Sequence, residues 1–292
     1  MKLMTFEAGQ GPRLGALIAG RVVDLAGASL GSLPAEMRSF LELGEPGAAR
    51  ARAVVEQARS GGQTMPLGEV KILAPILNPQ KIIAIGQNYW DHCREQKVDP
   101  PPAPIIFAKF PTSLIGPDEA IRWDPALTHQ VDFEAELAVV IGHAARRVSQ
   151  AEALDYVAGY TICNDVSARD LQFGDRQWVR GKSLDTFCPL GPYLVTKDEI
   201  ADPQKLAVRC RVNDQVMQDS NTSEMIFGVR YLIEYISRAF TLLPGDVITT
   251  GTPDGVGVFR SPKVFLKNGD TITLEIEGLG QLSNSCVEER QS

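Results

Sequence analysis

The run VDFEAELAVVIG at residues 131–142 constrains the fold of this chain more than any other segment. In an extended strand, Asp132, Glu134 and Glu136 share one face, because side chains alternate between the two faces of a strand. Glu134 and Glu136 would then lie about 6.6 Å apart. The apolar stretch at 137–141 is of the kind that is buried on both faces. This predicts carboxylates that point into a protected cavity, where they need a cation or a proton. A half-buried strand with a solvated polar face would show the same alternation.

The size and composition of the chain restrict the classes of function. With 292 residues, it is long enough to bury a sizeable core without disulfides. The 36 acidic and 29 basic residues include no basic run, so we expect no nucleic-acid partner. No apolar stretch is long enough to span a bilayer, so we expect no membrane association. The cysteines are odd in number and contain no C-x-x-C pair, which predicts reduced thiols and a cytoplasmic location. They are Cys93, Cys163, Cys188, Cys210 and Cys286.

The distribution of helix and strand signals divides the chain into two parts. We expect a small N-terminal α/β domain at 1–70, with a hairpin at 14–25 that turns at Ala19 and Gly20. Two helices would follow, the first ending at Gly44 and the second at Gly61 and Gly62. Residues 71–292 would form the main domain, where strand signals outnumber helices. A helix from Ser149 to Gly159 and a longer one opening at Asn221 are also predicted. The fold class predicted is α+β, rich in β-structure, with peripheral helices.

A third carboxylate, Asp165, follows the short apolar strand in YTICNDVSARDLQ, 160–172. Together with Glu134 and Glu136 it would supply three oxygen ligands, a set that suits Mg²⁺, Mn²⁺ or Ca²⁺ better than zinc or copper. Asp165 would equally serve as a helix N-cap. Arg169 and Gln172, three residues apart, would lie on the same side of the helical turn that follows.

The scarce histidines offer one candidate base. His92 lies in IGQNYWDHCREQ, and Glu95 would face the same way in a local helix. Such a carboxylate can orient the imidazole and raise its basicity, although a chance surface pair has the same spacing. His129 and His143 flank the acidic strand and are poor ligand candidates.

Two further segments contain candidate site residues. Lys182 stands in VRGKSLDTFCPLGP, a stretch rich in turn residues, where a solvated loop lysine is the ordinary expectation. Thr252 stands in ITTGTPDGVGVF, directly after a strand, where backbone amides can approach an anion. Neither nucleotide-binding glycine pattern is met in that loop.

Six segments, in this order along the chain, together resemble the fumarylacetoacetate hydrolase family. Within that family the chain looks closest to the branch that contains the fumarylacetoacetate hydrolase domain-containing protein of the second type. The segments are GQNYWDHCREQ, FAKF, DFEAELAVVIG, NDVSARD, GKSLDTFCPLGP and TTGTPDGVG. The resemblance implies the family's mixed β-sandwich roll, a homodimer, and a divalent metal, with Mg²⁺ expected and Mn²⁺ or Ca²⁺ as alternatives. It assigns that metal to Glu134, Glu136 and Asp165.

The resemblance also implies roles for other residues. His92 and Glu95 would form a dyad on a mobile lid, and Lys182 would stabilise developing charge. The substrate contacts it implies are Tyr89, Arg169, Gln172 and Thr252. Two positions depart from relatives: Gln87 stands where acylpyruvate-cleaving members commonly carry Arg, and Asn88 stands near an acidic fourth ligand of the founding enzyme.

These observations predict an enzyme that acts on a small 2-oxo or diketo acid. We expect hydrolysis of a C–C bond in a 1,3-diketo acid, acylpyruvate-like or a 2,4-diketo acid, through a metal-bound enolate. The alternative is an oxaloacetate tautomerase or decarboxylase, which would use the same enolate. A non-catalytic metal-binding scaffold is the alternative of another class, but it would not need His92, Glu95 or Lys182.

Overall fold

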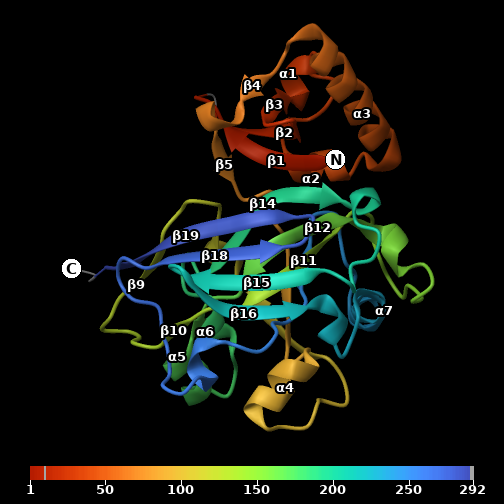
Figure 1. Cartoon of the computed structure of the whole chain (residues 1–292). Coiled ribbons are helices and arrows are strands. Elements are labelled where there is room, and N and C mark those ends of the chain that lie inside the picture. Colours follow the sequence, from red (N-terminus) through yellow and green to blue (C-terminus); the bar gives the residue numbers. More distant parts are fainter. Residues whose placement is uncertain (10, 290–292) are drawn as a thin grey trace.

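Two sheets pack against each other in the computed structural model, which describes residues 1–9 and 11–289 (Figure 1). The larger sheet has twelve strands. Its main path runs β4 (Met65–Pro66), β3 (Arg21–Asp24), β2 (Pro12–Ile18), β1 (Lys2–Glu7), β14 (Cys188–Thr196), β12 (Val157–Asn164), β11 (Ala135–Ile141), β17 (Val247–Thr249), β6 (Ile82–Gly86) and β7 (Ile105–Lys109), with β5 (Lys71–Leu73) beside β1 and β8 (Leu114–Ile115) beside β14.

The smaller sheet has five strands and covers the centre of the larger one. Its order is β16 (Gln215–Asn221), β15 (Ala207–Val212), β18 (Thr271–Ile276), β19 (Gly280–Glu288) and β9 (Ile121–Trp123). In β18 buried and more exposed residues alternate, whereas every residue of β11 is buried. The difference is expected, because β11 lies inside the larger sheet and under the smaller one. The predicted β-rich α+β class is confirmed.

The N-terminal unit extends the larger sheet, since β1 pairs antiparallel with β14. Its hairpin of β2 and β3 turns at Ala19 and Gly20, as predicted. Helices α1 (Leu25–Ala28), α2 (Met37–Leu41) and α3 (Gly44–Gly61) lie beside these strands (Figure 1). Gly44 begins α3, so the expectation that it ends a helix was wrong. A domain boundary at 70/71 stays a prediction, although β5 at 71–73 pairs with β1.

The described residues after the N-terminal unit form four α-helices: α4 (Trp90–Gln96), α5 (Arg169–Gly174), α6 (Val179–Lys182) and α7 (Val229–Ala239). In Figure 1, α4, α5 and α6 lie at the end of the molecule opposite the N-terminal unit. No helix in the described part of the chain is long and apolar enough to cross a membrane.

Two predicted helices were misjudged. Ser149 does bond Glu152, but only a 3-10 turn at Ala153–Tyr156 follows. Gly159 lies inside β12, where a Cβ would come within 2.2 Å of the carbonyl oxygen of Val195. This glycine therefore permits close strand packing and ends no helix. Asn221 caps a short 3-10 turn, Thr222–Glu224, and the long helix α7 begins only at Val229.

The acidic run at 131–136 is broken into two strands. Val131–Asp132 forms β10, which pairs with β13 (Ser167–Ala168), and β11 begins at Ala135. Glu134 lies in the break, where its N–H donates to the side-chain oxygen of Asn164 at 3.1 Å. The expected single continuous strand was therefore wrong. Glu134 and Glu136 still meet at one site, whereas Asp132 accepts the N–H groups of Gly257 and Val258.

Candidate active site

The three carboxylates of Glu134, Glu136 and Asp165 meet at the end of β11 and β12. Glu136 stands on β11, and Asp165 directly follows β12. The N–H of Asp165 donates to the carbonyl of Glu134 at 3.0 Å, which ties the two segments together. All three side chains are buried, and each offers an oxygen within 4.8 Å of those of the other two. The fold thus brings together residues 31 positions apart.

Buried cations alternate with these carboxylates. Lys182 Nζ lies 2.9 Å from Glu134 Oε2 and 2.9 Å from Asp165 Oδ2. Arg169 Nη2 lies 2.8 Å from the other oxygen of Glu134, and Arg169 Nε donates to Asp132 at 2.8 Å. The expectation of a solvated lysine at 182 was wrong, because this side chain is 2% exposed at the last residue of α6.

The two glutamates experience opposite electrostatic environments. Burial by itself would raise the pKa of Glu134, but Lys182 and Arg169 outweigh it and lower this pKa to about 2. Burial, and then the charges of Asp165 and Glu134, raise the pKa of Glu136 well above its usual range. A backbone N–H of Gly251 at 2.9 Å is its hydrogen-bond partner. Glu136 is therefore the carboxylate whose charge most needs a further cation.

A divalent cation fits this arrangement. Four buried acids, Asp132 and the three above, face three buried bases, Lys109, Lys182 and Arg169, and the excess negative charge lies at Glu136. An all-carboxylate donor set suits a hard cation such as Mg²⁺ or Mn²⁺. The geometry therefore supports a divalent-metal site formed by Glu134, Glu136 and Asp165.

The predicted helical neighbours His92 and Glu95 do lie together. Both are on α4, and His92 Nδ1 is 3.1 Å from Glu95 Oε2. The other oxygen of Glu95 accepts the N–H of Gly255 at 3.0 Å, which anchors α4 to the loop after β17. The imidazole is 6% exposed and packs edge-on against Phe259 at 5.8 Å between ring centroids. Glu95 is thus placed to orient the ring.

A cavity of about 80 Å³ lies between His92 and Glu134. Lys182 also lines it, with Phe107 and Trp178 as an aromatic wall whose ring centroids lie 5.4 Å apart. Glu136 and Asp165 do not line it, but their carboxylates lie beside that of Glu134. A small acid bound in this cavity would contact His92, Lys182 and Glu134. We treat this cavity as the candidate active site.

Three of the four predicted substrate contacts line the cavity, and the fourth, Tyr89, does not. Arg169, Gln172 and Thr252 line the cavity, but each already has a protein partner. Arg169 Nη1 donates to Gln172 Oε1 at 2.8 Å, and the Thr252 hydroxyl donates to Ala135 O at 3.1 Å. Tyr89 is completely buried and is not among the lining residues. Burial, and then the charge of Glu136, raise the pKa of Tyr89.

The two positions that depart from relatives also differ in placement. Gln87 lines the cavity, and its amide donates to Gln96 at 3.3 Å. Asn88 faces away from the carboxylates: its Nδ2 donates to Phe227 O and Thr250 O, and its Oδ1 accepts from Phe227 N. The side chain of Asn88 therefore has no oxygen to offer a cation in this arrangement.

Sequence reasoning missed two contributing side chains. Lys109 is buried beside Asp165, and Gln218 donates to Thr252. Lys109 carried a usable signal, since a lysine inside the apolar strand IIFAK needs a buried partner. Gln218 on β16 carried none, because its partner Thr252 is 34 residues away.

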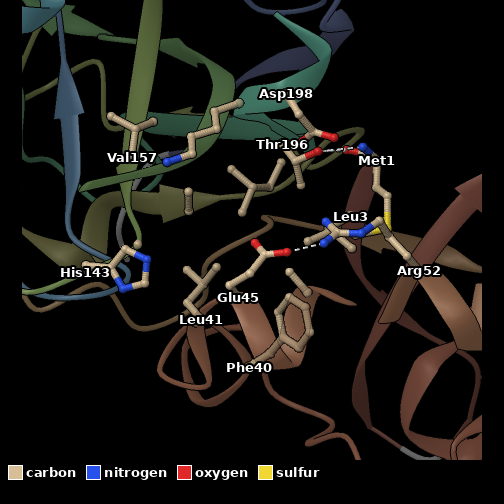
Figure 2. Close-up of a pocket in the computed structure, with 16 residues that line it drawn as sticks. Met1, Leu3, Phe40, Leu41, Glu45, Arg52, His143, Val157, Thr196 and Asp198 are labelled. Carbon is tan, nitrogen blue, oxygen red and sulfur yellow. Dashed lines mark hydrogen bonds and ion pairs between the residues drawn. The ribbon is translucent and has the colours of Figure 1, made fainter. Parts of the chain in front are cut away.

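A second pocket, of about 110 Å³, lies between the N-terminal unit and the main sheet (Figure 2). Phe40, Leu41 and Val157 supply apolar walls, and Glu45 pairs with Arg52 inside it. His143 is its one histidine among the described lining residues. It holds none of the predicted site residues and no cluster of carboxylates, so it is not the candidate active site.

Comparisons with known proteins agree with this geometry. The sequence pattern described as "Fumarylacetoacetate (FAA) hydrolase C-terminal" matches residues 81–287. A Xenopus laevis protein named "Oxaloacetate tautomerase fahd2, mitochondrial" is 48% identical over 98% of this chain and 90% of its own length. A putative HpcE protein from Mycobacterium smegmatis superposes with a TM-score of 0.87 at 36% identity, covering 99% of both chains. Both similarities extend over the N-terminal unit.

A third match includes bound groups. The crystal structure of maleylpyruvate hydrolase from Sphingobium sp. SYK-6, in complex with manganese (II) ion and pyruvate, superposes with a TM-score of 0.81 at 29% identity. It covers 99% of this chain and 100% of that one.

The comparisons correct one expectation and identify the family. The cytoplasmic location is contradicted, since the Xenopus laevis relative is named a mitochondrial protein. The described cysteines are free thiols, and the structure buries them, but reduced thiols do not distinguish one reducing compartment from another. With its pattern match, its relatives and its carboxylate site, this chain is an enzyme of the fumarylacetoacetate hydrolase family.

Proposed function

We propose that this enzyme is a divalent-metal-dependent oxaloacetate tautomerase. The observation that carries the proposal is the cluster of Glu134, Glu136 and Asp165, whose oxygens lie within 4.8 Å of one another, together with a cavity lined by Glu134, His92 and Lys182. Relatives 46–48% identical over nearly the whole chain are named as oxaloacetate tautomerases. The alternative reaction considered above therefore becomes the preferred one, ahead of C–C bond hydrolysis.

The size of the cavity supports a small substrate. At about 80 Å³ it is well below the roughly 300–1,000 Å³ of pockets for drug-sized ligands. A four-carbon dicarboxylate suits it better than a long acylpyruvate. Among the described residues no hydrogen bond occupies Gln172 Nε2, and the amide of Gln87 also lines the cavity. We propose that these amides contact the distal carboxylate.

The proposed mechanism moves one proton between carbon 3 and the oxygen on carbon 2. A divalent metal, which we propose to be Mg²⁺ or Mn²⁺, would act as a Lewis acid that stabilises negative charge on the 2-oxo acid. His92, with Nδ1 held by Glu95, presents Nε2 as the base for the carbon-bound proton. The Lys182 ammonium group adds positive charge beside the oxygen where charge develops. Arg169 holds Glu134, and Thr252 holds the segment at Ala135.

Ketonisation of the enol form tests this proposal directly. Enol oxaloacetate absorbs in the ultraviolet, so its decay would be followed by stopped flow with Mg²⁺-loaded and EDTA-stripped enzyme. We expect acceleration by the loaded enzyme alone. Equal rates for loaded and stripped enzyme would refute the proposal. The matched control is Lys205→Met, which removes an exposed lysine that pairs with Asp202 at the protein surface.

Hydrolysis of an acylpyruvate is the second candidate, because the His92–Glu95 pair is also suited to deprotonate water. A maleylpyruvate hydrolase is among the structures similar to this chain. Proton NMR of acylpyruvates, 2,4-diketo acids and oxaloacetate, with and without EDTA, separates the reactions by their products. If the enzyme cleaves any diketo acid faster than it ketonises oxaloacetate, C–C bond hydrolysis becomes the preferred reaction. Release of pyruvate from oxaloacetate would instead identify a decarboxylase.

We also propose that the enzyme is a homodimer that uses the open edge of the larger sheet. Strand β7 ends the main path of that sheet, and Phe110 beside it is 54% exposed. An apolar edge of this kind favours pairing with a second chain. Light scattering after size exclusion should give twice the chain mass. Phe110→Asp should shift the protein toward monomer, whereas Leu30→Asp, at a residue 95% exposed on the N-terminal unit, should not.

A further inference from the structure

A lysine outside the cavity lies behind the carboxylate cluster. Lys109 is the last residue of β7, and its side chain is 0% exposed. It is not among the residues that line the candidate active site. A bound acid would therefore not touch it, and its charge must serve another purpose.

The contacts of Lys109 connect three segments of the site. Its Nζ donates to Asp165 Oδ1 at 2.6 Å and to the carbonyl of Val166 at 3.4 Å. It also donates to the carbonyl of Lys182, at the end of α6. One ammonium group at the end of β7 thus donates two protons to the turn after β12 and the third to the end of α6.

Asp165 is held from two sides as a result. Lys109 holds Oδ1, while Lys182 approaches Oδ2, the oxygen on the side of Glu134. Without Lys109, Lys182 would be the one described cation that fixes the rotation of this carboxylate about its Cβ–Cγ bond. The carbonyl of Lys182 would also lose a buried donor, which costs about 1–3 kcal/mol.

The charge balance of the buried cluster gives a second argument. Asp132, Arg169, Glu134, Lys182, Asp165 and Lys109 form a continuous series of alternating negative and positive charges. Lys109 ends the series on the Asp165 side. Its removal would leave Lys182 as the one described cation in contact with Asp165, and Lys182 is shared with Glu134.

We propose that Lys109 is a positioning residue, which orients Asp165 as a metal ligand and fixes the end of α6 that carries Lys182. The inference rests on the proposed metal site, and it goes beyond it by assigning a role to a residue that touches neither metal nor substrate. Partners that orient metal ligands in this way typically change metal affinity by 10–100-fold when they are removed.

The test compares Lys109→Met with a matched variant at Lys81, the residue before β6. Lys81 pairs with the buried Asp246 at 2.6 Å, away from the cavity, so Lys81→Met also removes a lysine from a buried aspartate. Both variants would be titrated with Mn²⁺ and followed by electron paramagnetic resonance of the free ion. We expect the dissociation constant to rise about 10–100-fold for Lys109→Met and less than about twofold for Lys81→Met.

Metal binding, not turnover, decides the result. A folded Lys109→Met protein that binds Mn²⁺ as tightly as the wild type would overturn the proposal. If that variant does not fold, Lys109→Gln is judged by the same criterion, and failure of both to fold makes Lys109 a structural residue only. A wild type that binds no Mn²⁺ refutes the metal site and this inference together. Failed tautomerisation with normal Mn²⁺ binding refutes only the proposed reaction.

Discussion

The ammonium group of Lys182 lies 2.9 Å from Oδ2 of Asp165, with both side chains buried. The same nitrogen reaches Glu134 and stands over the ring of Phe107, 5.5 Å from its centroid. This lysine therefore joins two proposed metal ligands to the wall of the cavity. Its position suits a group that stabilises charge on a substrate without leaving the protein network.

Replacing Lys182 by methionine should impair catalysis more than folding. We expect kcat for enol oxaloacetate to fall about 10²–10³-fold, the usual effect of losing one preorganised charge-stabilising group. Methionine retains most of the side-chain volume. Stopped-flow rates and thermal melts of Lys182→Met would check this, with Lys205→Met as the control. A kcat within threefold of the wild type would contradict the assigned role.

Glu136 should make the metal-free protein sensitive to alkaline pH. Its pKa is raised by burial and by Asp165 and Glu134, so the folded state binds its proton more tightly than the unfolded state does. The resulting stability is complete below the unfolded pKa near 4.5 and is lost as pH rises through the folded pKa. In EDTA, Glu136→Gln should therefore exceed the wild type in stability at pH 8, and the difference should shrink toward pH 5.

With bound metal, the wild type should be more stable than Glu136→Gln. At 100 times its dissociation constant, Mn²⁺ would stabilise the wild type by about 2.7 kcal/mol, whereas Glu136→Gln has lost a ligand and gains less. Urea denaturation at both pH values, with EDTA or Mn²⁺, measures both effects. Glu69→Gln, at an exposed residue, is the control. Parallel pH profiles for wild type and Glu136→Gln in EDTA would contradict the prediction.

Glu95 should matter for the proton transfer and little for stability. Its Oε2 contacts His92, and its Oε1 accepts the N–H of Gly255. Glutamine can keep the second bond but cannot orient the imidazole with a carboxylate. We expect Glu95→Gln to slow deuterium uptake at carbon 3 of oxaloacetate in D₂O by about 10²-fold or more. NMR measures this uptake. If Glu95→Gln takes up deuterium as fast as the wild type while His92→Ala is inactive, Glu95 has no part in the proton transfer.

Asn88 should not become a metal ligand when it is made acidic. Its amide donates to Phe227 O and Thr250 O, and Asn88→Asp would leave both carbonyls facing a carboxylate. Two unpaired buried groups cost about 2–6 kcal/mol in total. We expect a melting temperature lower by about 5–15 °C and no gain in Mn²⁺ affinity. Tighter Mn²⁺ binding by Asn88→Asp would show that this position does reach the site.

Local spacing was enough to predict several parts of the structure. His92 with Glu95, and Arg169 with Gln172, are three residues apart on helices that do form, so their side chains meet as expected. The hairpin at Ala19 and Gly20 also follows from adjacent residues, both with positive φ. In each case the decisive interaction lies within one turn of chain, where periodicity is informative.

Capping patterns were less informative. The bond of Ser149 to Glu152 forms, yet the helix expected after it is a single 3-10 turn. Gly159 was interpreted as a helix end, but it lies in β12. A glycine is needed there because the backbone of β14 passes too close for a Cβ. Tertiary packing outweighed the local signal in that segment, since strand pairing buries every residue from 159 to 164.

The β-rich class, the acidic strand with Glu134 and Glu136, and the His92–Glu95 pair could be predicted from residue types and spacing, because these depend on neighbours in sequence. The direction of Asp132, the burial of Lys182 and the part played by Lys109 depend on contacts between distant segments. Lys109 meets Asp165 across 56 positions. A buried charge is stable only when an opposite charge lies beside it. Which side chains form such pairs depends on how the strands pack together, because the partners are far apart in the sequence.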